Sequence, residues 1–436
     1  MIGLFYPKTH QDPLLTIRFF NLRILFISNA LPPNFESQTI RNIYIIKGLQ
    51  DAGHKIFGVR NSTTLGDESL DKVLSFPLES IVVKSGWFLN FLSWISSLKI
   101  NFLKRFFNIL GPLLIIPDIN SGWSKEILEN QEVLSHVKDC DLIISASGSY
   151  ESHLAGHKLS KMYSLPLICE MGDPWALNPI WPENFWLKKL INKRLESRVI
   201  KHSSAVIFTT EETKQLYQEI YKNNNFHHIP MGFSKDEFDL STKNQKKSSK
   251  IDIVYVGIAY KGSRDITPLL DKIYNLNTPI LRAKFFGKVS DSFKEYVSKK
   301  NYNFVKFFGQ ISYEDSIAVI LNAHVLVILG NNSKLQIPGK TYMYLASGKP
   351  IIYLANQDLL NDPTWNLIQN FDGVFGFDKS LIGLDEILFK ISEEYDYILK
   401  KSSQRMKDSS LKKFDWEHLG KSFNSIVESV HEEKII

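Results

Sequence analysis

The chain of 436 residues has only two cysteines, Cys140 and Cys169, and it lacks several patterns that decide a protein's class at once. Two cysteines exclude a disulfide framework and a four-cysteine zinc site. There is no Walker-type loop and no close G-x-G-x-x-G after a strand, which disfavours an NTPase or a dinucleotide enzyme. Zinc-finger spacing and aromatic RNA-binding signatures are also missing, so nucleic acid is not an expected partner.

Charge and length place further limits on the chain. The net charge of +6 is mild, and it permits contact with phosphate or anionic lipid. The first residues lack a basic stretch, a long apolar run and a small-residue cleavage site, so we expect no signal peptide and a cytoplasmic location. A chain of this length exceeds one ordinary core, which favours two domains.

Apolar runs alternate with helical patterns along most of the chain. Residues 23–28 form the first continuous apolar run, and a helical pattern over 37–52 follows it. Strands that alternate with helices predict parallel sheets with right-handed crossovers. We therefore expect an α/β protein with two Rossmann-like doubly wound domains facing a cleft. The other strand-like runs are 55–59, 141–145, 165–170, 205–209, 251–257, 283–287, 305–309, 325–329 and 351–354.

A polar, basic stretch without periodicity at 241–250 is the best candidate linker. It predicts an N-terminal domain over 1–240 and a C-terminal domain over 251–415. The remaining residues, 416–436, contain a helical pattern at 416–431 that is long enough to pack back toward the N-terminal domain.

In doubly wound sheets, ligands lie beyond the carboxyl ends of the strands, so the loops at these ends are the candidate sites. Gly339 and Lys340 follow Pro338 at the start of a short helical pattern, where a backbone can approach an anion closely. A second loop, with Gly257, Lys261 and Arg264, could hold a diphosphate through its cations and backbone N–H groups. The alternative is a solvated loop with surface cations.

Two strand-end loops of the N-terminal half carry the candidates for chemistry. His153 lies after the strand that ends at Ser145, and it could contact substrate or transfer a proton. Asp173 could bond sugar hydroxyls, and Trp175 offers an apolar face for a sugar ring. The competing interpretations are a helix-cap or packing histidine, and a turn aspartate before proline beside a structural tryptophan.

The stretch 87–110 combines apolar residues at near-helical spacing with tryptophan, phenylalanine and basic residues. Its charges argue against a spanning helix. Such a helix suits the headgroup layer of an anionic leaflet, which would make the protein peripheral at the inner face of the cell membrane. The alternative is an amphipathic helix buried against the N-terminal sheet.

The order and spacing of these segments resemble the retaining GT-B glycosyltransferases of family 4, the type that acts in bacterial polysaccharide and lipopolysaccharide synthesis. The likeness runs from about residue 23 to the C-terminal helix. It is carried by 25–33 with Arg41, by the serine-rich turn and helix at 145–159, by Asp-Pro-Trp at 173–175, by 229–233 and by 338–350.

The resemblance implies a nucleotide-diphosphate sugar as donor and a lipid-linked or cell-surface glycan as acceptor. It also implies that the N-terminal domain over 1–240 is the acceptor-binding domain and that the C-terminal domain over 251–415 is the nucleotide-sugar-binding domain. His153 and Asp173 would serve the acceptor and the transfer. The family transfers with retention and needs neither metal nor cofactor, because cations and a helix N-terminus stabilise the departing diphosphate. The implied donor-binding residues are Gly257, Lys261, Arg264, Gly309, Ile311, Gly339, Lys340 and Thr341.

The chain departs from the family pattern at three places. Leu335 and Met343 stand where the family has two glutamates, the second of which bonds the ribose. Residues 34–37 replace a glycine pair, and Met231 replaces an asparagine. These changes leave the donor open and support a second hypothesis, a non-catalytic GT-B-fold partner in a glycan assembly complex. A sugar-nucleotide epimerase of the same architecture is disfavoured, because it would need paired carboxylates and histidines near the donor.

Overall fold

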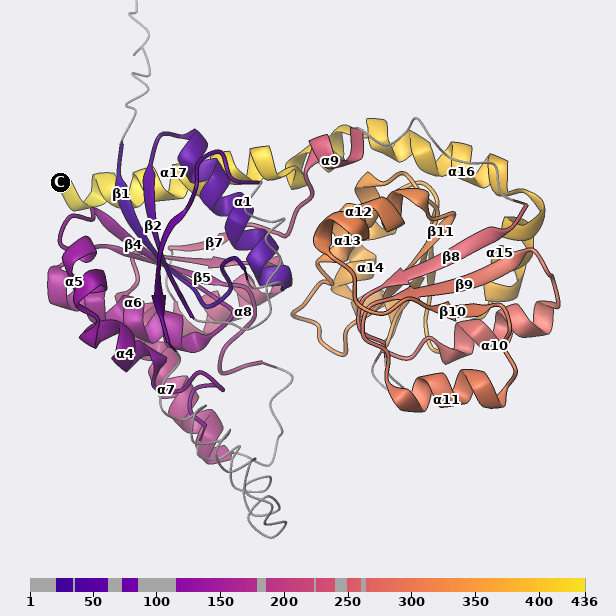
Figure 1. Cartoon of the computed structure of the whole chain (residues 1–436), viewed down its shortest axis with the longest axis horizontal. Helices are drawn as coiled ribbons and strands as arrows, with labels where there is room; N and C mark the ends of the chain where they lie inside the picture. Colours follow the sequence, from indigo (N-terminus) through magenta and orange to yellow (C-terminus); the bar gives the residue numbers. More distant parts are fainter. Residues whose placement is uncertain are drawn as a thin grey trace, which may run out of the picture.

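The computed structural model describes residues 21–33, 36–61, 73–84, 115–178, 186–222, 225–239, 249–259 and 264–435. These residues form two α/β domains that lie side by side, each built around a parallel sheet (Figure 1). The two doubly wound, Rossmann-like domains expected from the sequence are therefore confirmed.

The N-terminal sheet has seven strands in the order β3-β2-β1-β4-β5-β6-β7, and all neighbours are parallel. Its central strands are continuous apolar runs because helices cover both faces of the sheet. The strands are β1 (Arg23–Ile27), β2 (Lys55–Asn61), β3 (Glu79–Val83), β4 (Leu142–Ala146), β5 (Leu167–Met171), β6 (Ala205–Phe208) and β7 (Phe226–His228). The helices are α1 (Ser37–Asp51), α4 (Trp123–Glu129), α5 (Gln131–Val137), α6 (Tyr150–Tyr163), α7 (Trp186–His202) and α8 (Glu211–Tyr221).

The C-terminal sheet has six parallel strands in the order β10-β9-β8-β11-β12-β13. The chain reverses its direction of winding between β8 and β11, and in the first sheet it does so between β1 and β4. Such switch points open crevices beyond the strand ends. The strands are β8 (Ile251–Val256), β9 (Leu281–Phe286), β10 (Val305–Phe307), β11 (Val325–Leu329), β12 (Ile351–Leu354) and β13 (Val374–Phe377). The helices are α10 (Thr267–Leu276), α11 (Asp291–Lys299), α12 (Tyr313–Asn322), α13 (Lys340–Ala346), α14 (Pro363–Ile368), α15 (Leu384–Glu393) and α16 (Tyr395–Gln404).

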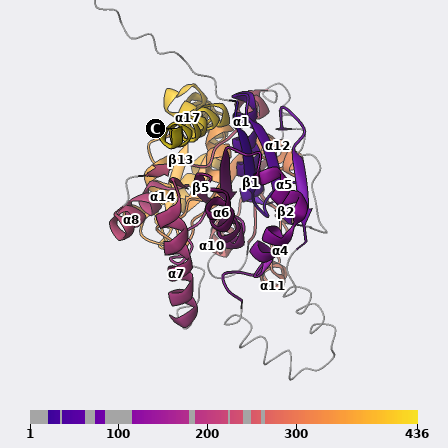
Figure 2. The same cartoon turned by 90° about the vertical axis from the view of Figure 1, so that its left-hand side faces the viewer.

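The chain passes between the domains at two adjacent points. Phe233, just before the short helix α9 (Lys235–Asp239), pairs with the segment that precedes the last helix: its N–H donates to Phe414 O at 3.0 Å, and its carbonyl accepts from Trp416 N at 2.9 Å. The last helix, α17 (Trp416–Ile435), then returns along α1 of the first domain (Figures 1 and 2).

The sequence predicts a last helix that packs back toward the N-terminal domain, and the structure describes the contacts that α17 makes there. Leu419, Phe423 and Val427 of α17 join the apolar core of the first domain. The two helices meet at a pair of glycines, since a Cβ on Gly48 would lie 2.6 Å from Gly420 Cα. The helix therefore belongs to the first domain by packing, although the second domain precedes it in the chain.

Several predicted features fall outside the described residues: the stretch 87–110, Lys261 and most of the linker at 241–250. Among the helices that the structure describes, none is both long and apolar enough to cross a membrane. The sequence did not reveal β3, β7 and β13, all of which lie at or next to a sheet edge. The two cysteines are buried and unpaired.

Candidate functional site in the interdomain cleft

Two adjoining cavities lie where the strand ends of the two sheets approach each other. The first, which we call the hinge cavity, has a volume of about 400 Å³ and reaches the crossing segment at Met231 and Gly232. The second, the cleft cavity, has a volume of about 660 Å³. Both are lined by Glu36, Ser37, Met231, Ile258 and Gly339, so the two cavities adjoin at these residues.

A row of glycines follows three neighbouring strands beneath the hinge cavity. Gly257, Gly287 and Gly309 come directly after or near the ends of β8, β9 and β10, and have φ values of 156°, 124° and 75°. A Cβ on Gly287 would lie 2.1 Å from Gly257 O, so this position excludes every other residue. Gly257 and Gly287 line the cavity, whereas after β10 the lining residues are Gln310 and Ile311, which follow Gly309. Backbone thus forms much of this floor.

Lys340 begins α13 and lines the hinge cavity. Its ammonium group donates a hydrogen bond to Val256 O at 3.0 Å. Burial, together with the positive charge of Arg264, lowers the pKa of Lys340 to about 8. The cation is therefore held with little solvent, where an anionic ligand would stabilise its charged form. Thr341, the next residue, is fully buried and does not line either cavity.

Two further cations surround the same space. Arg264 lines the cleft cavity and donates to Asn331 Oδ1 at 3.3 Å. Lys288 follows Gly287 and lines the hinge cavity, and our sequence analysis did not identify it. The signal that could have found it is the strand–glycine–lysine order at 286–288, in a loop that ends the neighbouring strand.

Asp173 lies across the cleft from these cations and joins the domains. It lines the cleft cavity, and its Oδ1 accepts a hydrogen bond from Gln336 Nε2 at 2.7 Å. Asp173 is exposed, but its carboxyl group lies in the wall of a cavity. The partial desolvation there raises the pKa of Asp173. Nearby, the hydroxyls of Thr210 and Thr213 both donate to Leu335 O at 3.0 Å. The segment before α13 therefore docks on the first domain.

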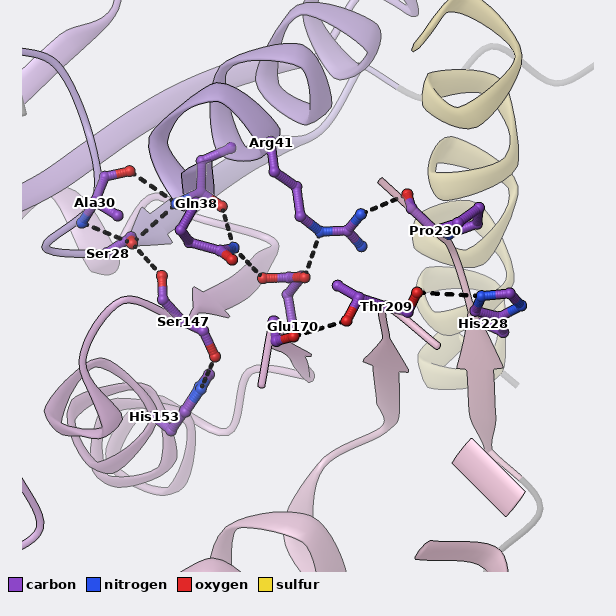
Figure 3. A network of polar contacts seen from close by, with 12 residues as sticks. Ser28, Ala30, Gln38, Arg41, Ser147, His153, Glu170, Thr209, His228 and Pro230 are labelled. Carbon is purple, nitrogen blue, oxygen red and sulfur yellow. Dashed lines mark hydrogen bonds and ion pairs between the residues drawn. The ribbon is translucent and has the colours of Figure 1, made fainter. Parts of the chain in front are cut away.

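His153 lies behind the cavity wall rather than in it. Its ring is fully buried on α6, with Ser145 Oγ 3.0 Å from Nδ1 and Ser147 Oγ 3.1 Å from Nε2 (Figure 3). Burial lowers the pKa of His153 to about 3, so its imidazole is neutral at physiological pH. Ser147 lines the cleft cavity and His153 does not, so in this arrangement the histidine reaches the cleft through Ser147.

A buried polar network fixes the start of α1 at the cavities. Arg41 Nε donates to Glu170 Oε1 at 2.6 Å, and its Nη1 donates to Pro230 O at 2.7 Å (Figure 3). Gln38 Nε2 donates to the other oxygen of Glu170 at 2.8 Å. Because these bonds tie α1 to β5 and to the crossing segment, they also hold the preceding residue Glu36 at the junction of the two cavities.

Asp118 is a second wall residue that the sequence did not reveal. Its carboxylate accepts from Tyr150 N at 2.6 Å and from Ser149 Oγ at 3.0 Å, so it anchors the start of α6. Desolvation raises the pKa of this carboxyl group, and these hydrogen bonds oppose the rise. Tyr150 stacks on Trp175 with ring centroids 4.9 Å apart. Trp175 is fully buried and donates to Asn192, so the structural interpretation of this tryptophan holds.

The structure thus brings most of the predicted residues into one space. Gly309, Thr341 and His153 are not among the residues that line the cavities, and Lys261 lies outside the described residues. Within the described ranges, no group of three or more histidine, cysteine, aspartate and glutamate side chains could hold a metal ion. The predicted residues that line the cavities are Asp173, Gly257, Arg264, Ile311, Gly339 and Lys340.

Comparison of the chain with known proteins identifies its fold but no sequence family. No family model and no curated protein sequence matches the chain. Among solved structures, HepE from Anabaena in complex with UDP has a TM-score of 0.64 at 15% identity, over 94% of this chain and 100% of that one. Sucrose-phosphate synthase from Thermosynechococcus elongatus has a TM-score of 0.65 at 14% identity over the same shares. The lipopolysaccharide outer core galactosyltransferase WaaB has a TM-score of 0.53 at 13% identity, over 94% and 99%. The fold is therefore that of the GT-B glycosyltransferases.

Proposed function

We propose that this protein is a glycosyltransferase that moves a sugar from a nucleotide-diphosphate donor to a lipid-linked or cell-surface glycan. One observation carries the proposal: two adjoining interdomain cavities have Lys340, Lys288 and Arg264 on the side of the C-terminal domain and the carboxylate of Asp173 on the side of the N-terminal domain. The cationic side suits a diphosphate, and the other side suits hydroxyl groups. The structural relatives with UDP or UDP-glucose bound support this assignment.

The donor would lie with its diphosphate against the C-terminal domain. The glycines after β8 and β9 let the backbone approach the ligand, since no side chain stands between them and the cavity. Ile311 and the neighbouring backbone would lie against the base. The acceptor would enter from the cleft cavity, where Asp173 and Ser147 line the N-terminal side.

We also propose transfer with retention and without a metal. As the bond to the sugar breaks, negative charge develops on the diphosphate, and fixed cations in a poorly solvated cavity stabilise it strongly. Lys340 and Arg264 are placed for this role. The metal-independent mechanism predicts that activity survives excess chelator, and analysis of the anomeric configuration of the product tests retention.

The first experiment is a binding measurement. Calorimetry or thermal shift with UDP-, GDP- and dTDP-sugars should show stabilisation by at least one donor, because a ligand that binds the folded state raises the melting temperature. A protein that none of these nucleotide diphosphates stabilises would contradict the proposed donor site. Hydrolysis or transfer of the bound donor then separates an enzyme from a binding protein.

A second candidate function has one specific observation in its favour. Met343 lines the hinge cavity at the position where the family has its ribose-binding glutamate, and a thioether is a weak hydrogen-bond acceptor. A non-catalytic GT-B-fold partner in a glycan assembly complex would bind a nucleotide or a glycan without turnover. Binding of a donor without hydrolysis or transfer to any acceptor would favour this candidate.

We further propose that the protein acts in the cytoplasm at the inner face of the membrane, through the stretch 87–110. The support is its pattern of apolar, aromatic and basic residues. Flotation with anionic liposomes at low salt is the direct test, with neutral liposomes as the control. Protein that stays at the bottom of the gradient in both cases would contradict this proposal.

A further inference from the structure

Among the described residues that line the hinge cavity, Glu36 is the one with a carboxylate. It comes from the N-terminal domain, whereas the cations of this cavity come from the C-terminal domain. Glu36 precedes α1 of the N-terminal domain, whereas Gly257, Ile311 and Lys340 belong to the C-terminal domain. Glu36 also lines the cleft cavity, so it stands where the two spaces join. A ligand that extends from one cavity into the other passes this carboxylate.

The carboxyl group of Glu36 has no protein partner in the part of the chain that the structure describes. The residue occupies the cap position of α1, yet its side chain accepts no hydrogen bond from the first turn. The buried bonds of Arg41 hold α1 in place without it. Desolvation by the cavity walls raises the pKa of Glu36. Although Glu36 is exposed, the cavity walls limit the hydration of its carboxylate, and the hydroxyl donors of a ligand would compensate for this loss.

Three other side chains around the hinge cavity are poor substitutes for this carboxylate. Met343 has no strong acceptor. The hydroxyl of Tyr313 already donates to Glu237 at 3.0 Å, and the hydroxyl of Ser316 donates to Tyr313 O at 2.6 Å. A vicinal diol has two O–H donors at a spacing that one carboxylate accepts with its two oxygens. Ser37 and Gln310 also bring acceptor oxygens to the wall, but among the described lining residues Glu36 is the one with a carboxylate, whose two charged oxygens fit such a diol.

We propose that Glu36 is a donor-binding residue that accepts hydrogen bonds from a vicinal diol of the nucleotide sugar. The diol belongs either to the ribose or to the sugar that is transferred. The inference rests on the proposed function and adds to it: both domains hold the donor, one through cations and one through Glu36. Because a carboxylate repels phosphate, its contribution comes from the hydroxyl groups alone.

The test compares Glu36→Gln with wild-type protein by calorimetry. The ligands are the nucleotide sugar that the wild-type protein binds among UDP-glucose, GDP-mannose and dTDP-glucose, the corresponding free nucleotide diphosphate, and inorganic pyrophosphate. Glu36→Gln should weaken binding of the nucleotide sugar roughly 10- to 100-fold, as expected for a charged hydrogen-bonded contact. Pyrophosphate, which has no diol, should bind unchanged or more tightly. Glu219→Gln, an exposed change on α8, is the matched control.

The free nucleotide distinguishes the two sources of the diol. With UDP or GDP, an equal loss for the nucleotide diphosphate assigns the contact to the ribose, and an unchanged affinity assigns it to the transferred sugar. The deoxyribose of dTDP has no vicinal diol, so with dTDP-glucose only the transferred sugar can supply the contact. Equal affinity of Glu36→Gln and wild-type protein for the nucleotide sugar would overturn the inference and leave the proposed function intact. An equal loss for pyrophosphate would overturn it as well, since the effect would then not involve hydroxyl groups. Wild-type protein that binds no nucleotide overturns the proposed function itself.

Discussion

At the scale of single residues, Lys340 is a partly buried cation in the wall of the hinge cavity, and its charge should affect donor binding. In the proposed complex its ammonium group contacts the diphosphate, so Lys340→Met should weaken donor binding by about 1.5–3 kcal/mol. Burial and the charge of Arg264 lower the pKa of the free lysine to about 8. Wild-type affinity should therefore fall as the pH rises above 8, and the affinity of Lys340→Met should stay flat over the same range. Calorimetry between pH 7 and 9.5 measures both.

The stability of Lys340→Met without ligand is a second test of the lowered pKa of Lys340. Lys340 has a pKa of about 8 when folded, against an ordinary value of 10.5, so below pH 8 the folded protein bears the full cost of a desolvated charge. This cost disappears as the pH rises from 8 toward 10.5. Lys340→Met should therefore make the ligand-free protein more stable at pH 7, by about 1–3 kcal/mol, with a smaller gain at pH 10. A variant that is less stable at pH 7 would contradict this account of Lys340.

The sequence predicted those cavity-lining residues that lie in a loop recognisable from its own sequence and its place beside a strand. Gly257, Gly339 and Lys340 follow or precede strands in the chain, so their place at the cavity could be inferred locally. Glu36 could not be identified in this way, because the wall opposite it comes from the other domain. The burial of His153 could not be predicted either, since a histidine near a strand end has the same sequence pattern whether its side chain faces the cleft or the core.

At the scale of elements, the strands whose bounds the sequence predicted best are buried on both faces. The runs that form β11 and β12 have the bounds that the sequence predicted, because every residue of these strands is buried. The missed strand β3 has exposed residues and a single sheet neighbour, and β7 has three residues. Such short or half-exposed strands carry too little apolar pattern to be recognised, and pairing with the rest of the sheet determines them.

The contact between α1 and α17 gives a prediction about elements. Gly48 and Gly420 let the two helices approach until backbone meets backbone. In Gly48→Ala the new methyl group would overlap Gly420 Cα, which forces the helices apart. Although alanine favours the helix by about 1 kcal/mol, we expect a net loss of stability of about 1–3 kcal/mol, since overpacking against backbone cannot be relieved by a rotamer change.

Urea denaturation measures this loss as a lower midpoint. Ser425→Ala, an exposed change on α17, should leave the midpoint nearly unchanged. The residues of α17 that join the first domain include Leu419 and Phe423, so the helix carries part of that domain's core. A midpoint of Gly48→Ala equal to that of wild-type protein would show that the helices separate without cost and that the glycine contact is unimportant.

At the scale of the whole molecule, a few polar contacts set the relation between the domains. Glu237 of α9 accepts hydrogen bonds from Tyr44 of the first domain at 2.7 Å and from Tyr313 of the second at 3.0 Å. On the other side of the cleft, Gln336 donates to Asp173. The donor would lie between these contacts, so they determine how far apart the two halves of its site are held.

Loss of the Glu237 contacts should therefore loosen the whole molecule while each domain stays folded. In Glu237→Leu both tyrosine hydroxyls lose their shared acceptor, and we expect a larger radius of gyration in solution scattering without ligand. Because the proposed donor contacts both domains, saturating donor should bring the radius back toward the wild-type value. The double variant Tyr44→Phe with Tyr313→Phe removes the same two bonds and keeps the stack of Tyr44 on Trp416, so it should expand equally. Asp236→Asn, on the neighbouring exposed residue, should scatter like wild-type protein. If Glu237→Leu and the double variant both matched wild-type protein, the Glu237 contacts would not determine how far apart the domains are held.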